Sequence, residues 1–279
     1  MNRVMRLGSL ALVGVIGLTG CGSSTDSNDP LADGVLTVGM EADYAPYNWT
    51  TNEANASEYA YPISGSDALA DGYDVRMAEA LADELGVELE IVKMSWDGLI
   101  PGVQSGSIDA IIAGMSPTEE RLQQIDFTDA YHEDDIDLVV VVNKDSGYAD
   151  ATSLDDLAGA NISAQTGTFH TDLLDQIDIA DDSTAPLPDF ASLIQATASG
   201  SIDGYIAESA TAEVQVANNP DLTIVDVSDE FVLDPSQTTS AIGVKKDTGL
   251  VDDLNGALGT IDNDTRNEWM AEASAMSQE

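Results

Sequence analysis

The chain has 279 residues, 43% hydrophobic and 22% charged, a composition typical of a folded protein with room for two domains. Only 9 basic residues stand against 51 acidic ones, which gives a formal net charge of −42. Such an acidic surface repels nucleic acids and anionic lipid headgroups, so neither is an expected partner. Each of the few basic residues is therefore a candidate for a specific task.

The first segment has the architecture of an export signal. A short basic start leads into an apolar run over residues 7–18 and then into small residues before Cys21, the single cysteine. This run is too short and wrongly flanked for a membrane-spanning helix. The letters LTGC at its end resemble a bacterial lipobox, in which the cysteine becomes the lipidated first residue. We therefore expect a lipoprotein signal peptide over residues 1–20 and a lipid-anchored polar tether over residues 21–30. The rest of the chain should lie outside the cytoplasmic membrane, anchored to its outer face.

Strands and helices then alternate along the chain. Residues 34–40 predict a strand, whereas residues 50–71 have no period and predict an inserted loop. A helix is predicted within residues 72–86 from a stripe formed by Val75, Ala78, Leu81, Ala82 and Leu85. Later strands are expected at 136–144, 161–167, 201–208, 222–227 and 239–247, and later helices at 168–177, 189–200, 210–219, 250–261 and 264–275. This alternation predicts an α/β fold with mostly parallel sheets flanked by helices.

One stretch of sequence occurs twice. SGSIDAIIA at residues 105–113 returns as SGSIDGYIA at residues 199–207, and the match extends to residues 95–115 against 189–209. The copies diverge where Gly114 of the first faces Glu208 of the second. Two similar lobes with different tips are therefore expected, joined where strands 136–144 and 239–247 cross between them. Open α/β sheets bind ligands at the carboxyl ends of their strands, so the cleft between the lobes is the expected site.

Five stretches identify a family: VGMEADYAPYNW, GYDVRMAEALADELG, WDGLIPGVQSGSIDAIIAGMSPTEERLQQIDFTDAYH, AQTGTFHTDLL and GSIDGYIAE. Together they resemble the family 3 extracellular solute-binding proteins, the polar amino-acid receptors of bacterial ABC importers. The resemblance implies a periplasmic-binding-protein-like fold of type II with two hinge strands. Lobe 1 would hold residues 31–139 and 246–279, and lobe 2 residues 140–245. It further implies a monomer without cofactor or catalytic step, which captures an amino acid by hinge closure and delivers it to a membrane permease.

Residues 116–121 combine a predicted helix start with an arginine. Ser116, Pro117 and Glu119 predict a capping box at a helix start directly after a strand, and such a helix end attracts a carboxylate. Arg121, one turn into this helix, can add a bidentate fork; an ordinary surface ion pair is the alternative. By the resemblance, Arg121 and Ser116 would bind the ligand carboxylate, and the Gly114 carbonyl would meet the ligand ammonium.

The second lobe has a turn of the same kind at residues 165–170. By the resemblance, Thr168 and the Phe169 amide would meet the same carboxylate from the other side. The family usually has a second small hydroxyl residue where Phe169 stands, so only its backbone contact carries over. Glu208 occupies the position of a family aspartate that binds the α-ammonium; a solvated carboxylate is the alternative.

Aromatic residues would surround the ligand side chain. The resemblance places Tyr44 and Trp96 on either side of it, with Tyr47 nearby, although core packing is an alternative for Tyr47. Glu41 stands where the family often has an acid that reaches the distal end of the ligand. These residues and the net charge slightly favour lysine, arginine or a similar cation as the ligand.

Two other functions remain open for a protein of this fold. The same fold also occurs in extracytoplasmic dehydratases that act on cyclic carboxylic acids, where Glu208 would be the candidate acid or base. A ligand-sensing lipoprotein is the third reading. His132 and His170 are too far apart to suggest a metal site, and both are expected at the surface.

Overall fold

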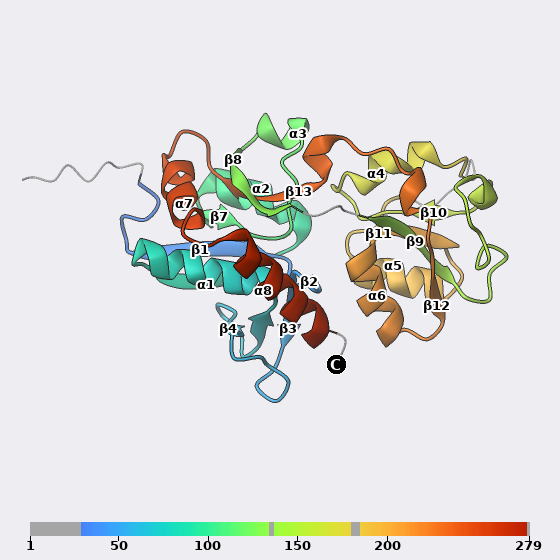
Figure 1. Cartoon of the computed structure of the whole chain (residues 1–279), viewed down its shortest axis with the longest axis horizontal. Coiled ribbons are helices and arrows are strands. Elements are labelled where there is room, and N and C mark those ends of the chain that lie inside the picture. The colour runs from blue at the N-terminus through green and yellow to red at the C-terminus, as the bar shows by residue number, and fades with distance from the viewer. Residues whose placement is uncertain (1–28, 134–136, 180–184, 278–279) are drawn as a thin grey trace, which may run out of the picture.

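The computed structural model describes residues 29–133, 137–179 and 185–277. They form two α/β lobes that lie side by side (Figure 1). Within these ranges, none of the helices combines the length and the hydropathy that a membrane span requires.

The first lobe is built on a five-stranded sheet of order β6-β1-β7-β13-β8. Its strands are β1 (Val35–Met40), β6 (Glu88–Lys93), β7 (Ala110–Ile111), β8 (Asp126–Glu133) and β13 (Thr239–Val244). Its helices are α1 (Tyr73–Leu85), α2 (Trp96–Ser105), α3 (Glu119–Leu122), α7 (Leu250–Leu258) and α8 (Asn263–Met276). Helices α1 and α2 both contact β1, and the apolar stripe of α1 is buried there as predicted, apart from the half-buried Leu85.

The second lobe is built on a four-stranded sheet of order β10-β11-β9-β12. Its strands are β9 (Leu138–Asn143), β10 (Ile162–Ser163), β11 (Gly204–Glu208) and β12 (Leu222–Val225). Its helices are α4 (His170–Leu173), α5 (Phe190–Ala198) and α6 (Ser209–Asn218). Strand β9 is buried from Leu138 to Val142 because α5 and α6 pack on this sheet.

Each sheet contains one reversed strand. Strand β13 is antiparallel to β7 and β8, and β9 is antiparallel to β11 and β12. The chain passes between the lobes at the cleft, where the parallel strands end. A strand that follows this passage directly, without a helix in between, must therefore run antiparallel to them. The sheets are therefore mixed. Strands 136–144 and 239–247 were predicted to span both lobes, but β9 pairs only within the second sheet and β13 only within the first. The chain therefore returns to the first sheet between Val225 and Thr239, ahead of the boundary expected at 245/246.

The repeat corresponds to one α-helix and one strand in each lobe: α2 with β7, and α5 with β11. The aspartate of the repeat accepts the same kind of backbone hydrogen bond in both copies. Asp109 accepts a hydrogen bond from the Thr37 N–H at 2.9 Å, and Asp203 accepts one from the Asn161 N–H at 2.8 Å. Each carboxylate thus ties the start of its strand to the neighbouring strand. The repeated phrase preserves this register together with the buried Leu99 and Leu193.

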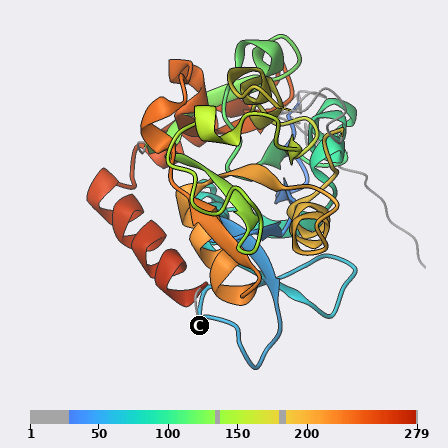
Figure 2. The same ribbon diagram turned by 90° about the vertical axis from the view of Figure 1, so that its right-hand side faces the viewer.

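Segment 50–71 is more ordered than the predicted loop. It contributes to a small antiparallel sheet of order β2-β3-β5-β4, formed by β2 (Asp43–Tyr44), β3 (Asn48–Thr51), β4 (Tyr61–Pro62) and β5 (Leu69–Asp71). The strands are too short to show a period in sequence. Arg76 of α1 fixes the segment, because its guanidinium stacks 3.8 Å from the centre of the Tyr59 ring. Figures 1 and 2 place the segment beside the C-terminal end of α8.

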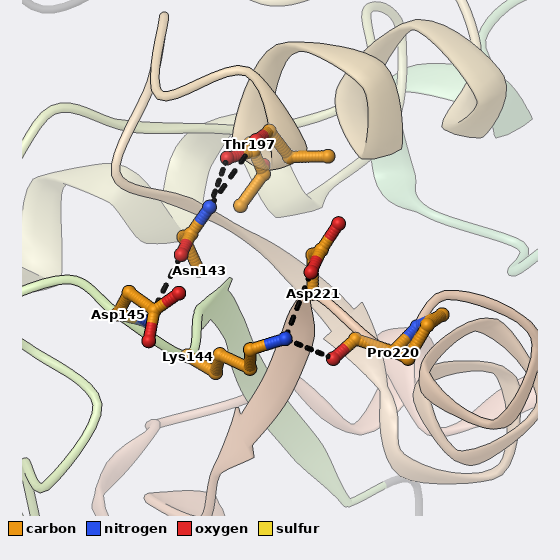
Figure 3. A network of polar contacts seen from close by, with 7 residues as sticks. Asn143, Lys144, Asp145, Thr197, Pro220 and Asp221 are labelled. Atoms are coloured by element: carbon orange, nitrogen blue, oxygen red, sulfur yellow. Dashed lines mark hydrogen bonds and ion pairs between the residues drawn. The ribbon is translucent and has the colours of Figure 1, made fainter.

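The end of the second sheet away from the cleft is closed by polar contacts (Figure 3). The Asn143 side chain donates to the carbonyls of Thr197 and Ala198 at 3.3 and 3.2 Å, which caps α5. The Lys144 ammonium donates to the Pro220 carbonyl and to Asp221, both at 2.8 Å. These contacts secure the sheet at one end and leave the opposite end of its strands to form the cleft.

Candidate functional site

A cavity lies between the lobes, at the ends of β7 and β11. Twelve residues line it: Glu41, Tyr44, Trp96, Gly114, Ser116, Arg121, Gln165, Thr168, Phe169, His170, Phe190 and Glu208. Nine of the ten residues predicted from sequence to contact a ligand are among them. The exception is Tyr47.

Arg121 reaches the cavity from a shorter helix than the sequence predicts. Helix α3 has Thr118 as its N-cap, whose hydroxyl accepts from the Arg121 N–H, so the predicted capping box at Ser116 is wrong. The Ser116 carbonyl instead accepts from the Thr118 N–H at 3.0 Å and from Arg121 Nη1 at 2.8 Å. The Arg121 guanidinium thus donates to the Ser116 carbonyl, which a backbone N–H of the helix would otherwise use. The helix therefore has Thr118 as its N-cap and not Ser116.

The Arg121 side chain is buried without a carboxylate partner. It is 6% exposed, and besides Ser116 it donates from Nη2 to the Gly167 carbonyl of the other lobe at 3.1 Å. No carboxylate of the described residues forms an ion pair with it. Burial lowers the pKa of Arg121 to about 10, which still leaves it charged. A guanidinium has five N–H donors, so three remain for a bound anion.

Glu208, at the end of β11, is the complementary group. It is 8% exposed, and it accepts a hydrogen bond from the Tyr44 hydroxyl across the cleft. Its one basic neighbour among the described residues is His170, whose Nε2 lies 3.9 Å from Oε1. Burial without a cation raises the pKa of Glu208 to about 8.

Gly114 lies against the Tyr44 ring in the first lobe. Its φ is +60°, and a Cβ atom there would lie 2.7 Å from Tyr44 Cε1. Its N–H donates to the Tyr131 hydroxyl at 2.9 Å, and that hydroxyl donates to the buried Asp74 at 2.7 Å. The turn after β7 is therefore held rigidly, and only glycine fits.

Glu41 meets the second lobe through an amide. The Gln165 side chain donates from Nε2 to both carboxylate oxygens of Glu41, at 3.1 and 3.0 Å. Burial is the main reason why the pKa of Glu41 is raised to about 7, and the Gln165 hydrogen bonds oppose it. The charges of Asp43 and Asp189 also raise this pKa, whereas the charge of Lys93 lowers it. This end of the cavity concentrates negative charge.

Aromatic rings stack along the cavity. Tyr44 lies parallel to Phe190, with ring centres 5.9 Å apart, and on its other face to Tyr47, at 4.9 Å. Tyr47 therefore packs behind Tyr44 and does not line the cavity, in line with the core packing that was its alternative role. Trp96 donates from its indole nitrogen to the Gly167 carbonyl at 3.0 Å and lies 5.2 Å from the Arg121 guanidinium carbon.

The turn at residues 165–170 closes the cavity from the second lobe. The Thr168 hydroxyl donates to the Gln165 carbonyl at 2.8 Å, and Phe169 is the N-cap residue of α4. Both residues line the cavity.

Sequence reasoning missed Gln165, His170 and Phe190. The repeat aligns Phe190 with Trp96, so its cavity position could have been inferred from that symmetry. His170 and His132 are 3% and 5% exposed, which contradicts the expected surface positions. Both pack against aromatic rings: His170 on Phe169, and His132 on Tyr47 and Tyr73.

Comparison with known proteins agrees with this architecture. The family model for bacterial extracellular solute-binding proteins, family 3, matches residues 36–272. The chain belongs to this family. This membership also implies a location outside the cytoplasm.

Relatives of this family 3 protein carry the names of binding proteins. It is 30% identical to the arginine-binding extracellular protein of Bacillus subtilis, over 86% of each chain. It is also 30% identical to ABC transporter arginine-binding protein 1 of Escherichia coli, over 81% of this chain and 84% of that protein.

Solved structures show the same two-lobe fold. An amino acid ABC transporter substrate-binding protein of Streptococcus pneumoniae bound to L-arginine has a TM-score of 0.72 at 29% identity, covering 88% of this chain and 97% of that one. An ancestral arginine-binding protein bound to glutamine has a TM-score of 0.69 at 30% identity, covering 86% and 97%.

Proposed function

We propose that this protein is the substrate-binding component of an amino-acid ABC importer. It captures a polar L-amino acid between its lobes and delivers it to a membrane permease. The observation that carries the proposal is a buried arginine without a carboxylate and a buried glutamate without a cation in the wall of one cavity. An α-amino acid carries the two opposite charges that these groups lack.

The binding mode follows from the donors and acceptors. Arg121 receives the ligand carboxylate with its three remaining N–H groups, assisted by Ser116, Thr168 and the Phe169 amide. Glu208 and the Gly114 carbonyl receive the ammonium. Because Arg121 belongs to one lobe and Glu208 to the other, a single zwitterion bridges both lobes and stabilises the closed state. Binding of this kind needs no catalytic step.

The distal end of the cavity favours a cationic side chain. Glu41 is buried there with the charges of Asp43, Asp189 and Lys93 nearby, and the rings of Trp96 and Phe190 line the same cavity. A guanidinium or ammonium group would compensate the Glu41 charge and interact with the rings. The relatives of Bacillus subtilis and Escherichia coli, both named as arginine-binding proteins, agree with this class of ligand.

The chain would act as a monomer on the outer face of the membrane, held by a lipid on Cys21. Residues 1–28 lie outside the described residues, so this part of the proposal rests on the sequence. Metabolic labelling with a fatty acid tests it. The wild-type chain should incorporate label and stay with the membrane, and Cys21→Ser should do neither.

Thermal unfolding of the mature protein tests the ligand. Each L-amino acid and several small carboxylic acids, cyclic ones included, would be added separately. A ligand at about 100 times its Kd stabilises by about 2.7 kcal/mol, which raises Tm visibly. We expect a rise with lysine, arginine or a similar amino acid. A rise only with cyclic acids would favour the dehydratase reading, and no rise with any compound would contradict amino-acid capture.

A further inference from the structure

His170 is a cavity residue with unused hydrogen-bonding capacity. Both of its ring nitrogens are buried without a partner, a state shared in the described part of the chain only by the Thr211 hydroxyl. Buried polar atoms in native proteins almost always have a hydrogen-bond partner, and an unsatisfied one costs stability. A ligand in this cavity is a natural source of that partner, because His170 is part of its wall.

The position of His170 points to one end of the ligand. It begins α4, directly after Phe169, and the two rings meet edge to face with centres 4.6 Å apart. The imidazole also lies close to Glu208, whose Oε1 is 3.9 Å from Nε2. The other oxygen of Glu208 already accepts from Tyr44. A group bound at Oε1 therefore lies next to His170.

The imidazole is neutral in this environment. Burial, together with the nearby charge of Arg121, lowers the pKa of His170 to about 3. A neutral imidazole has one N–H donor and one nitrogen lone pair. It can therefore accept a hydrogen bond without placing a second positive charge beside a ligand cation.

We infer that His170 is a further ligand contact, whose Nε2 lone pair accepts a hydrogen bond from the α-ammonium group bound at Glu208. An ammonium group has three N–H donors. Glu208 and the Gly114 carbonyl accept two of them, and His170 accepts the third. The site thus selects ligands with a free primary ammonium next to the carboxylate. This inference rests on the proposed function.

Binding of two ligands to the mature protein and to two His170 variants of it tests this inference. The ligands are L-arginine, or the amino acid that gives the largest rise in Tm, and its des-amino analogue, in which hydrogen replaces the ammonium. The variants are His170→Leu, which cannot accept, and His170→Gln, which can. His132→Leu is the matched control, because His132 is equally buried but does not line the cavity. Calorimetry or competition gives each Kd.

We expect His170→Leu to weaken binding of the amino acid by about 10- to 100-fold, the range for one hydrogen bond to a charged group. Its affinity for the des-amino analogue should stay within about twofold of the wild type, since the lost bond involves only the ammonium. His170→Gln should recover most of the loss, and His132→Leu should bind both ligands normally. Equal losses for both ligands would show a structural role and overturn the inference. An unchanged affinity for the amino acid would overturn it as well.

A spectroscopic measurement keeps the inference testable if His170→Leu does not fold. The chain has only 2 histidines, so nitrogen-labelled imidazole signals are few and can be assigned with the His132 variant. Saturation of the wild type with the amino acid should shift the signal of the unprotonated His170 nitrogen, and the des-amino analogue should not. Equal signals with both ligands would overturn the contact. If no amino acid binds the wild type, the proposed function itself fails. If one binds and the His170 signal does not respond, only this inference fails.

Discussion

Replacement of Arg121 by methionine should separate ligand binding from stability. The side chain uses two of its five N–H donors on the carbonyls of Ser116 and Gly167, which leaves enough for a bidentate carboxylate. Two hydrogen bonds to a charged group contribute about 3–6 kcal/mol, so Arg121→Met should weaken binding by about 10²- to 10⁴-fold. Calorimetric titration with the preferred amino acid measures this loss directly.

The ligand-free protein should respond very differently. Methionine removes a buried charge that has no carboxylate partner, which favours folding, and it abandons two carbonyl acceptors, which disfavours it. These effects oppose each other, so we expect the free energy of unfolding to change by less than about 1 kcal/mol, or about 2–4 °C in Tm. An ordinary core truncation costs about 2–5 kcal/mol. Urea unfolding without ligand distinguishes the two cases.

Arg76→Met is the matched control. Arg76 forms an ion pair with Glu272 and stacks on Tyr59 and Trp269, all outside the cavity. Its loss should lower stability and leave the Kd unchanged. The reasoning fails if Arg121→Met still binds within tenfold of the wild type, or if Arg76→Met weakens binding as strongly.

Three further outcomes follow from the charges. Glu41→Gln should weaken binding of cationic amino acids by about tenfold or more and leave uncharged ones unaffected, measured as a ratio of Kd values. The pKa values of Glu41, about 7, and Glu208, about 8, lie above the ordinary 4.5, so the folded state holds protons that the unfolded state releases. The free energy of unfolding without ligand should thus fall as pH rises from 5 to 8, and Glu208→Gln should reduce that fall; equal slopes in urea titrations would contradict the cause. Finally, the net charge of −42 should make stability increase with potassium chloride, and a flat urea midpoint between 0.1 and 1 M salt would contradict the expected self-repulsion.

The repeated phrase made the main parts of the site predictable. It placed a buried strand in each lobe and marked Gly114 and Glu208 as the tips that differ, and both residues line the cavity. Hydrophobic periodicity and internal repeats can be read from the sequence without knowledge of tertiary contacts. The strand β11 and the helix α1 follow directly from such patterns.

The remaining parts depend on contacts that no local pattern contains. The start of α3 moved to Thr118 because a guanidinium occupies the Ser116 carbonyl. Gln165 became a cavity residue because it meets Glu41, which is 124 positions away in the chain. The second difference arises where the lobes meet, and pairing across a cleft has no signature in either segment alone.

The state of the basic residues is the strongest argument for a binding role. In a chain with 51 acidic residues, Arg76 and Lys144 each have a carboxylate partner. Arg266 has none among the described residues, but it is half-buried and donates to the carbonyls of Ile261, Leu258 and Ala130 around the end of α7. Arg121 differs from all three, and from the less buried Lys93, Lys245 and Lys246, because it is buried and keeps donors unused beside a cavity. Folding alone would favour an apolar side chain there. The cost is explained if an anionic group from outside the chain completes the pair, as a captured amino acid would.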